Sequence, residues 1–530
     1  MELDWHGERS DLPELALLDQ LAPEGPIDLV AVRAHRSSRL RSEMAARSID
    51  ACVLVDPVNI RYATGARNMQ VFTARNPARY LFLPQSGPVV LHEFAGCAHL
   101  AAGLETIDEI RPAITASYVA AGDAIATVES AWAAQVAALA REHCGLRAAV
   151  GLERVNAGAA LALRDAGLHI VDAQAPVERA RAIKSDGELD CVRASVRATE
   201  LAVGRLRDAL RPGLRENELW SILHQGVIAL GGEYVETRLL SSGPRTNPWF
   251  QETGERRLEA NELVALDTDV VGCHGYYCDF SRTFHTGPGA PTPRQRELYR
   301  LAHEQVHHNL ELLRAGVSFR EYAERAWAIP ERFVANRYYV SAHGCGMTGE
   351  YPYLYHAMDF ADSGYDGVIE PGMTLCVESY IGEDGGAEGV KARAAAAGHG
   401  VRAGAALLVP VRGEPARLGQ GVAPGGHGRE ARPRRRGFRG SATRGECRHV
   451  RHDRSHRHPP VPDRGSGRAA RRAAPPHRGD ALAVRGAGRR PVAGRAAGDR
   501  PGARPVLDDQ VRLAQVRGQA ERIAAVQDRD

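Results

Sequence analysis

The chain has 530 residues, of which 44% are hydrophobic and 25% charged, so it can form large cores and more than one domain. Its net charge of +3 excludes a chain that is strongly basic or acidic throughout, and no apolar run approaches the ~20 residues of a membrane-spanning helix. Without a secretion signal at the start, and with nine cysteines but no C-x-x-C pair, we expect a cytoplasmic protein with reduced thiols.

Short apolar segments alternate with Ala-rich stretches in the first third of the chain. Residues 51–55 and 80–83 are apolar, and Pro or Gly closes each segment, which is typical of short buried strands. Residues from about 120 to 145 and from about 157 to 166 are rich in Ala and have helical spacing. We therefore expect an α/β domain over residues 28–175, and we assign it no chemistry because it has no clustered His, Asp or Cys.

A second domain begins where helix-capping residues appear. Ser185 and Glu188 have the spacing of a capping box, and apolar residues then recur with helical spacing to about Leu210. Another helix is expected over residues 216–230, and the strands follow these helices. We expect this second domain to extend over residues 180–391.

Three acidic side chains lie in one predicted β-hairpin, formed by residues 263–271 and 276–284. Asp267 and Asp269 are two residues apart, so they should face the same side of one strand, and Asp279 should lie on the returning strand. Three carboxylates inside an apolar hairpin repel one another and resist burial unless cations compensate their charge. The pattern therefore predicts a metal site.

Two further candidate ligands follow later in the chain. His343 precedes Gly344, and Gly346 follows closely, so the backbone has room to approach the imidazole. Glu378 interrupts an apolar strand. Each of these residues, taken singly, has an ordinary explanation as a turn carboxylate or a hydrogen-bonded loop histidine. Together, oxygen donors with one imidazole suit Mn, Fe or Zn in a hydrolytic type of site, where two ions activate a water or polarise a substrate oxygen.

These segments, in this order, resemble the pita-bread metalloenzymes, which include Xaa-Pro peptidases, prolidase, methionine aminopeptidase and creatinase. The resemblance extends over residues 28–391, and its hallmarks are Arg181-Ala182-Ile183-Lys184-Ser185, Arg211-Pro212-Gly213 and His343-Gly344-Cys345-Gly346. Within this group the chain is most similar to dimethylsulfoniopropionate lyases of the DddP type. That similarity is carried by residues 56–64 with 68–70, residues 236–250, and Asp267-Thr268-Asp269. Peptidases normally have a glycine at the position of Asp269, which favours the lyases.

The resemblance implies a creatinase-like α/β N-terminal domain, residues 28–175, and an α+β pita-bread catalytic domain, residues 180–391. It implies that a pair of divalent metal ions, Fe, Mn or Zn, is held by Asp267, Asp269, Asp279, His343 and Glu378. It also places Tyr338 beside a small-molecule substrate and implies a homodimer. The lyase reaction removes a proton next to a carboxylate, expels dimethyl sulfide and leaves acrylate, so it needs a general base and a group that holds the carboxylate.

The chain departs from this family at two positions. The lyases have an aspartate where this chain has Gly349, and the second histidine that peptidases place near this point is also absent. The family continues after the residue matching Glu378 with a strand Val-Lys-Leu-Glu, whose glutamate bridges the metals. This chain instead reads Val390-Lys391-Ala392-Arg393. Neither the lyase activity nor the peptidase activity of the family can therefore be assumed for this chain. We predict that the chain as written retains metal ions weakly.

From residue 392 onward the composition changes. Residues 392–530 contain 30 Arg, no Lys and 12 acidic residues, a net charge of +18, so residues 1–391 carry 3 − 18 = −15. The segment is dominated by Arg, Gly, Ala and Pro, so it cannot bury enough apolar surface to offset the entropy of ordering, and we predict a disordered, low-complexity tail. A basic nucleic-acid-binding arm is the alternative, and DNA binding that is salt-sensitive and lost on truncation at Lys391 would support it.

A reading-frame change explains this tail better than a nucleic-acid partner. One inserted G converts the Leu-Glu codons CTC-GAG into GCT-CGA, which encode the Ala392-Arg393 seen here. We therefore predict a frameshift after Lys391 and an out-of-frame tail, which resequencing the DNA across that codon checks.

Three functions stay open on the sequence alone. The first is a metal-dependent lyase that cleaves a small carboxylate-bearing substrate, and the second is an Xaa-Pro dipeptidase or aminopeptidase. The third is a pita-bread binding module without catalysis, which Gly349 and Arg393 make credible. Assays with dimethylsulfoniopropionate, creatine and Xaa-Pro dipeptides separate the first two, and metal analysis separates the third.

Overall fold

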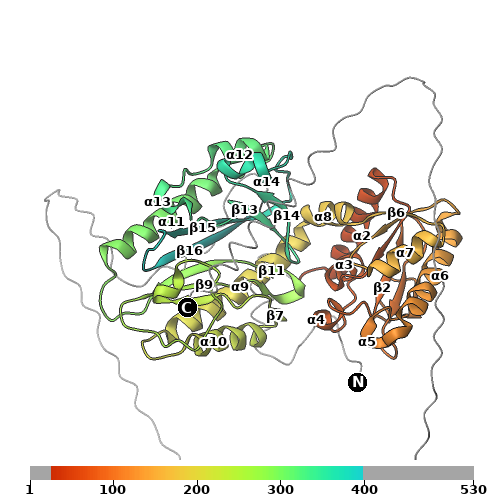
Figure 1. Ribbon diagram of the computed structural model, residues 1–530, viewed down its shortest axis with the longest axis horizontal. Coiled ribbons are helices and arrows are strands. Elements are labelled where there is room, and N and C mark those ends of the chain that lie inside the picture. Colours follow the sequence, from red (N-terminus) through yellow and green to blue (C-terminus); the bar gives the residue numbers. More distant parts are fainter. Residues whose placement is uncertain (1–25, 398–530) are drawn as a thin grey trace, which may run out of the picture. The chain divides into compact units, whose positions relative to one another are not determined.

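The computed structural model describes residues 26–397 (Figure 1). The predicted tail therefore lies outside the described residues from position 398 onward. The part that is described begins with a six-stranded sheet in the order β4-β3-β2-β1-β5-β6. Its strands are β1 (Ala51–Leu54), β2 (Tyr80–Pro84), β3 (Val90–Glu93), β4 (Glu109–Pro112), β5 (Ala149–Leu152) and β6 (His169–Asp172). The sheet is mixed, since β1 pairs antiparallel with β2 and parallel with β5.

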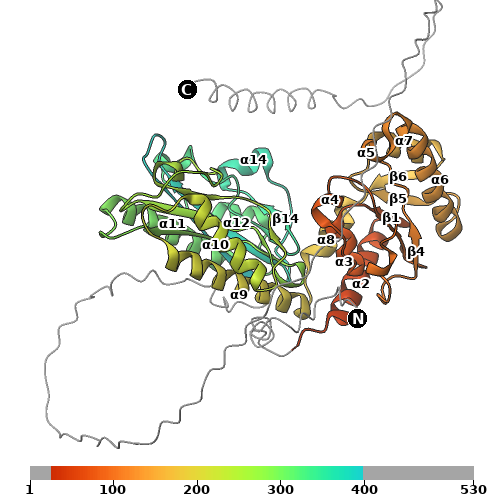
Figure 2. The same cartoon turned by 90° about the horizontal axis from the view of Figure 1, so that it is seen from below.

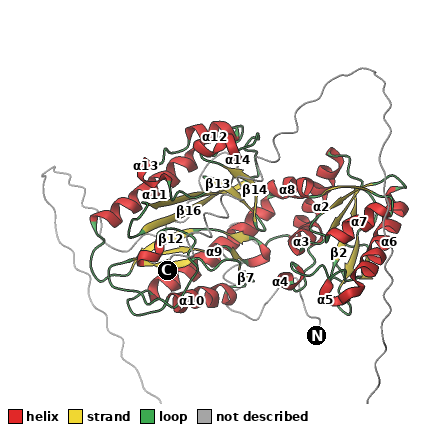
Figure 3. Cartoon of the chain, in the orientation of Figure 1, coloured by secondary structure: helices red, strands yellow, loops and turns green. Residues whose placement is uncertain are grey.

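Helices accompany this sheet, so the predicted α/β N-terminal domain is confirmed (Figure 3). They are α2 (Leu29–Ala46), α3 (Pro57–Thr64), α4 (Gln70–Thr73), α5 (Tyr118–Ala121), α6 (Ile125–Cys144), α7 (Ala157–Asp165) and α8 (Gln174–Ala182), with 3-10 turns η1 (Ala98–Leu100) and η2 (Gly122–Ala124). The two predicted strands correspond to β1 and β2, and the two Ala-rich stretches correspond to α6 and α7.

The central strands are buried on both faces, which explains their continuous apolar sequence. Cys52 and Leu54 of β1 belong to one hydrophobic cluster, whereas Ala51 and Val53 belong to another. Successive side chains of a strand point to opposite faces, so these are the two sides of the sheet. Trp132 of α6 packs in the second cluster.

His92 of β3 is a titratable group buried in this core. Its ring stacks on Tyr80 with centroids 4.4 Å apart, and neither ring nitrogen has a hydrogen-bond partner within residues 26–397. Burial, reinforced by the positive charge of Arg111, lowers the pKa of His92 from its ordinary 6.5 to about 4.

We expect the His92→Phe variant to be more acid-stable than the unaltered chain. The unfolded chain takes up the proton of His92 near pH 6.5 and the folded chain only near pH 4, so stability falls as the pH drops through this window. Lowering the pH from 7 to 5 therefore reduces the free energy of unfolding by about 2 kcal/mol. Phenylalanine keeps the stacked ring but takes up no proton, so the variant should not lose this stability. Urea unfolding at both pH values measures the difference. His99→Gln, at an exposed position, is the matched control, and an equal pH dependence in His92→Phe and the unaltered chain would contradict the prediction.

The second domain starts with two long helices, as predicted. Helix α9 (Asp186–Ala209) has the full capping box, because Ser185 accepts from the backbone N–H of Glu188 and the Glu188 carboxylate accepts from the backbone N–H of Ser185. Helix α10 (Glu216–Ala229) packs against α9 (Figure 2). Their approach is close, since a side-chain carbon at Gly226 would lie 2.8 Å from the Cβ of Ala202.

Three sheets follow these helices. Their strand orders are β11-β10-β7, β12-β9-β8 and β14-β13-β15-β16. The strands are β7 (Tyr234–Val235), β8 (Leu240–Ser242), β9 (Leu263–Asp267), β10 (Val270–Val271), β11 (Tyr277–Cys278), β12 (Ser281–His285), β13 (Ala342–Cys345), β14 (Gly349–Leu354), β15 (Thr374–Gly382) and β16 (Gly389–Ala397). Strand β16 continues past residue 391 and pairs with β15 along its whole length, so the prediction of a disordered tail is wrong for residues 392–397.

The remaining helices of this domain are α11 (Pro293–Leu312), α12 (Phe319–Arg325), α13 (Glu331–Val334) and α14 (Phe360–Ser363). The 3-10 turns are η3 (Gly243–Thr246), η4 (Cys273–Gly275) and η5 (Ala357–Asp359). Helix α11 covers one face of β15 and β16 (Figure 3). Among residues 26–397, every helix is too short or too polar to cross a bilayer.

One detail of the predicted hairpin is wrong. Strand β9 ends at Asp267, and Asp269 has a φ of 38°, which lies in the left-handed region and interrupts the strand. Asp279 lies between β11 and β12 rather than within a strand. The three carboxylates therefore come from strand ends and a bend, while Asp267 still lies opposite Ser281 in the β9–β12 pair.

Candidate metal centre

The structure brings the five predicted ligands together. Ligand atoms of Asp279, His343 and Glu378 lie within 4.8 Å of one another, and so do those of Asp267, Asp269 and Asp279. Asp279 belongs to both groups, so the five side chains form one continuous cluster. All five are buried, and Glu378 is fully inaccessible to solvent. Two adjacent groups of this kind have the donor chemistry of a site for a pair of divalent ions.

Backbone elements and neighbouring hydroxyls position these donors. The Ser281 hydroxyl donates to Asp267 at 2.7 Å, and the Thr237 hydroxyl donates to Asp269 at 2.5 Å. Nδ1 of His343 lies 2.8 Å from the carbonyl oxygen of Gly344. A carbonyl only accepts, so Nδ1 carries a proton, and Nε2 faces Asp279 at 3.2 Å and Glu378 at 3.0 Å.

Two cations of strand β16 enter the same cluster. The Lys391 ammonium contacts Glu378 and lies 3.7 Å from Asp267. The Arg393 guanidinium lies 3.1 Å from Asp267 and 3.6 Å from Asp269. It also contacts Asp279 and Glu378 directly, so it touches every carboxylate of the predicted ligand set.

These charges set the pKa values within the cluster. Burial alone raises the pKa of Asp267, but Arg393 and then Lys391 outweigh it, so this pKa is lowered. Burial and the charge of Asp267 raise the pKa of Asp269. Burial lowers the pKa of His343, but its hydrogen bond and charge interaction with Glu378 outweigh burial and raise it to about 9.

The carboxylates and the imidazole of the cluster suit divalent ions, but the guanidinium of residue 393 opposes their binding. Carboxylate oxygens and one imidazole are suitable ligands, whereas a guanidinium placed against the same oxygens repels a second cation. The chain as written therefore does not fit a pair of ions as long as Arg393 occupies this position. The resemblance implied a glutamate at the position of Arg393, but the entry of the Arg393 side chain into the cluster was not predicted. The available signal was Lys391, which is two residues away and so shares a face of the strand.

Aromatic side chains surround Tyr338, which is placed next to the cluster. The Tyr338 hydroxyl accepts from Arg393 Nη2 at 3.2 Å, and its ring centroid lies 4.0 Å from the Lys391 ammonium. Phe250 stacks on Tyr338 at 5.4 Å, and Tyr339 lies 4.8 Å from it, measured between ring centroids. Phe250 is 54% exposed and has a φ of 74°, a strained backbone for a bulky residue and one that occurs preferentially at functional sites.

Gly349 begins strand β14 and leaves open space where a side chain would be. A Cβ built at this position meets no atom of the described residues within 4 Å. The neighbouring Glu350 cannot replace the missing carboxylate, because it is buried and paired with Arg181 at 2.8 Å and with Lys184. Residues 349 and 350 therefore offer no free carboxylate at the start of β14.

Comparison with known proteins shows where the chain belongs. Residues 190–409 match the model of metallopeptidase family M24, and residues 36–183 match that of the creatinase/prolidase N-terminal domain. The dimethylsulfoniopropionate lyase DddP of Roseobacter denitrificans is 34% identical over 396 residues, which cover 73% of this chain and 85% of the relative. That of Roseovarius nubinhibens is 35% identical over 364 residues, covering 68% and 82%. An Xaa-Pro dipeptidase from Bacillus anthracis has the same fold, with a TM-score of 0.55 at 21% identity, covering 69% of this chain and 95% of that structure.

Proposed function

Because the chain belongs to metallopeptidase family M24, with the creatinase/prolidase N-terminal domain and the pita-bread fold, we propose that its centre acts on a small carboxylate-bearing substrate as a carbon–sulfur lyase. The substrate would be dimethylsulfoniopropionate, and the products dimethyl sulfide and acrylate. The observation that carries the proposal is the identity of 34% and 35% to two such lyases over more than four-fifths of their length.

In this proposal Asp267, Asp269, Asp279, His343 and Glu378 are the residues that would hold a pair of Fe, Mn or Zn ions if the Arg393 guanidinium did not occupy their oxygens. Such ions would supply positive charge for the substrate carboxylate and for the charge that develops next to it. The guanidinium of Arg393 opposes their binding, so we expect the chain as written to be a slow enzyme.

The aromatic side chains beside the cluster, Tyr338, Phe250 and Tyr339, support a substrate that carries a positive charge. The face of an aromatic ring attracts cations, and Tyr338 already has the Lys391 ammonium over its face. Phe250 and Tyr339 are about half exposed next to it, so their rings are accessible from solvent. A sulfonium group would be received by these rings while the carboxylate end of the substrate points toward the cations of the cluster.

Cleavage requires a base that removes the proton from the carbon next to the carboxylate. The electron pair of that C–H bond forms the double bond of acrylate, and the carbon–sulfur bond breaks with its electron pair leaving on dimethyl sulfide. Tyr338 stays protonated at neutral pH and cannot take this proton, because burial and then the charge of Glu378 raise its pKa well above 10. With Gly349 in the expected place of the base, a buffer or water base has to take the proton, which again predicts a slow reaction.

Product analysis of the purified full-length chain tests the proposal. With dimethylsulfoniopropionate, we expect dimethyl sulfide in the headspace and acrylate in solution in equal amounts, above the level of an Asp267→Ala/Asp279→Ala variant. Creatine and Xaa-Pro dipeptides should be left intact. Dipeptide cleavage without dimethyl sulfide would instead assign the chain to the peptidases of its family, and no turnover of any of these substrates would assign it to the binding modules.

A further inference from the structure

The oxygens that would hold metal ions are already in contact with a positive charge of the chain itself. Asp267, Asp269, Asp279 and Glu378 are all at least nine-tenths buried, so their negative charges cannot be compensated by water. Arg393 Nη2 donates a hydrogen bond to Oδ2 of Asp267 at 3.2 Å, and Nη1 forms an ion pair with Oδ1 of the same carboxylate at 3.1 Å. The same guanidinium contacts the other three carboxylates.

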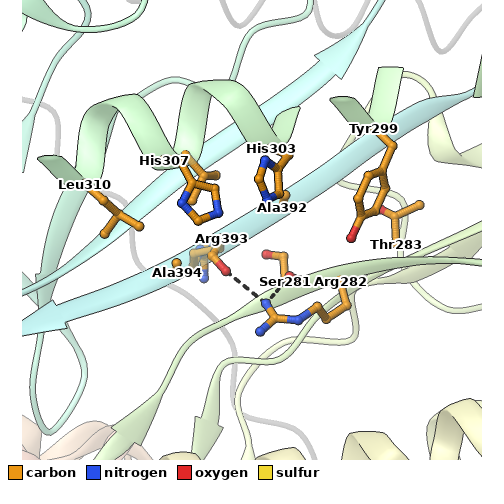
Figure 4. Close-up of a pocket in the computed structure, with 11 residues that line it drawn as sticks. Ser281, Arg282, Thr283, Tyr299, His303, His307, Leu310, Ala392, Arg393 and Ala394 are labelled. Atoms are coloured by element: carbon orange, nitrogen blue, oxygen red, sulfur yellow. Dashed lines mark hydrogen bonds between the residues drawn. The ribbon is translucent and has the colours of Figure 1, made fainter. Parts of the chain in front are cut away.

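The backbone fixes the position of this guanidinium. Residue 393 lies opposite Glu378 in a β15–β16 ladder that is in register from Thr374 to Gly382. On the other side, Arg282 Nη1 donates to the carbonyl oxygen of Arg393 at 3.0 Å and to that of Ser281 at 2.8 Å, which ties β16 to β12 (Figure 4). Lys391, two residues before Arg393, directs its ammonium to the same carboxylates, so strand β16 delivers two positive charges to the cluster.

We propose that Arg393 is a built-in counter-cation, which compensates the acidic cluster without metal and competes with divalent ions for the same oxygens. This inference rests on the ligand set of the proposed function and is independent of its substrate. The identity of residue 393 then decides whether the folded chain depends on metal. A guanidinium makes the centre stable and nearly metal-free, whereas a carboxylate at the same place adds one more negative charge and makes the centre require ions.

Metal titration of the full-length chain and three variants tests this inference. The unaltered chain, Arg393→Lys, Arg393→Met and Arg393→Glu are produced in medium that contains Mn²⁺ and then stripped with a chelator. Bound metal is measured by elemental analysis after Mn²⁺ or Zn²⁺ is added and excess is removed by gel filtration. Melting temperature is measured for each protein with and without Mn²⁺.

We expect the unaltered chain and Arg393→Lys, which keep the positive charge, to hold little metal and to melt at the same temperature with or without Mn²⁺. Arg393→Met leaves buried carboxylates less compensated, so it should melt lower than the unaltered chain when stripped and recover with Mn²⁺. Arg393→Glu should bind ions stoichiometrically, and its melting temperature should rise by roughly 5–10 °C, the shift expected when the ion concentration is about 100 times Kd.

Stoichiometric metal in the unaltered chain, with a melting temperature that rises with Mn²⁺ as much as in Arg393→Glu, would overturn the inference. If Arg393→Met and Arg393→Glu fail to fold, the titration of the unaltered chain and of Arg393→Lys still decides the question. None of these measurements uses a substrate. A variant that binds metal and yet releases no dimethyl sulfide would therefore count against the proposed lyase function and leave the role of Arg393 standing.

Discussion

The triple variant Gly349→Asp/Ala392→Leu/Arg393→Glu is expected to release dimethyl sulfide at least ~100 times faster than the unaltered chain, since a positioned general base alone contributes about 10² to 10⁴ in rate. A Cβ added at Gly349 meets no atom of the described residues within 4 Å, so the first atom of an aspartate side chain has room there. Removing the guanidinium frees the four carboxylates, and the new glutamate adds a donor opposite Glu378. The measurement is kcat for dimethyl sulfide release with Mn²⁺, Fe²⁺ or Zn²⁺ present.

Two controls separate the contributions in this variant. Asn in place of Asp at position 349 keeps the size of the side chain but cannot take a proton, so the gain from the base should disappear. The Ala392→Leu/Arg393→Glu pair alone should improve metal binding and raise kcat less than the triple variant. Equal rates for the Asp and Asn versions would show that position 349 is not where the base acts.

Local patterns in the sequence were sufficient for much of the fold. The capping box at Ser185 and Glu188, the helix predicted over residues 216–230 and the buried strands β1 and β2 all follow from short-range spacing. The structure confirms them, with the helix ending one residue earlier, at Ala229. The acidic residues and the histidine were predicted to gather because buried carboxylates need partners, and the geometry brings them within ligand distance of one another. Their role as metal ligands, like the homodimer and the cytoplasmic location, stays a prediction.

The interactions that the sequence did not predict are those between distant segments. Glu350 pairs with Lys184, 166 residues earlier in the chain, and no periodic pattern relates the two. The left-handed backbone of Asp269 breaks a strand that its neighbours favour. The direction of the Arg393 side chain depends on the register of β16 against β15, which is set by the whole sheet rather than by residues near position 393.

Replacing Glu350 by Ala is expected to lower the free energy of unfolding by about 3–5 kcal/mol, the usual effect of leaving a buried charge without its partner. Glu350 is buried against Arg181 and Lys184, which are themselves almost inaccessible. Without the carboxylate, two cations remain in the interior. Strand β14, which carries Glu350, pairs with β13, which carries His343, so the loss should also loosen one side of the acidic cluster. Urea unfolding at pH 7 measures the effect.

A second ion pair of the same chain provides the matched control for this last prediction. Glu370 lies 3.9 Å from Arg179, and both side chains are substantially exposed, so Glu370→Ala should change the free energy of unfolding by less than about 1 kcal/mol. Adding Lys184→Met to Glu350→Ala removes one of the stranded charges, so the double variant should be more stable than Glu350→Ala alone. If Glu350→Ala is no more destabilising than Glu370→Ala, the buried pair does not hold β14 in place, and the position of Gly349 relative to His343 must be fixed by the β13–β14 ladder alone.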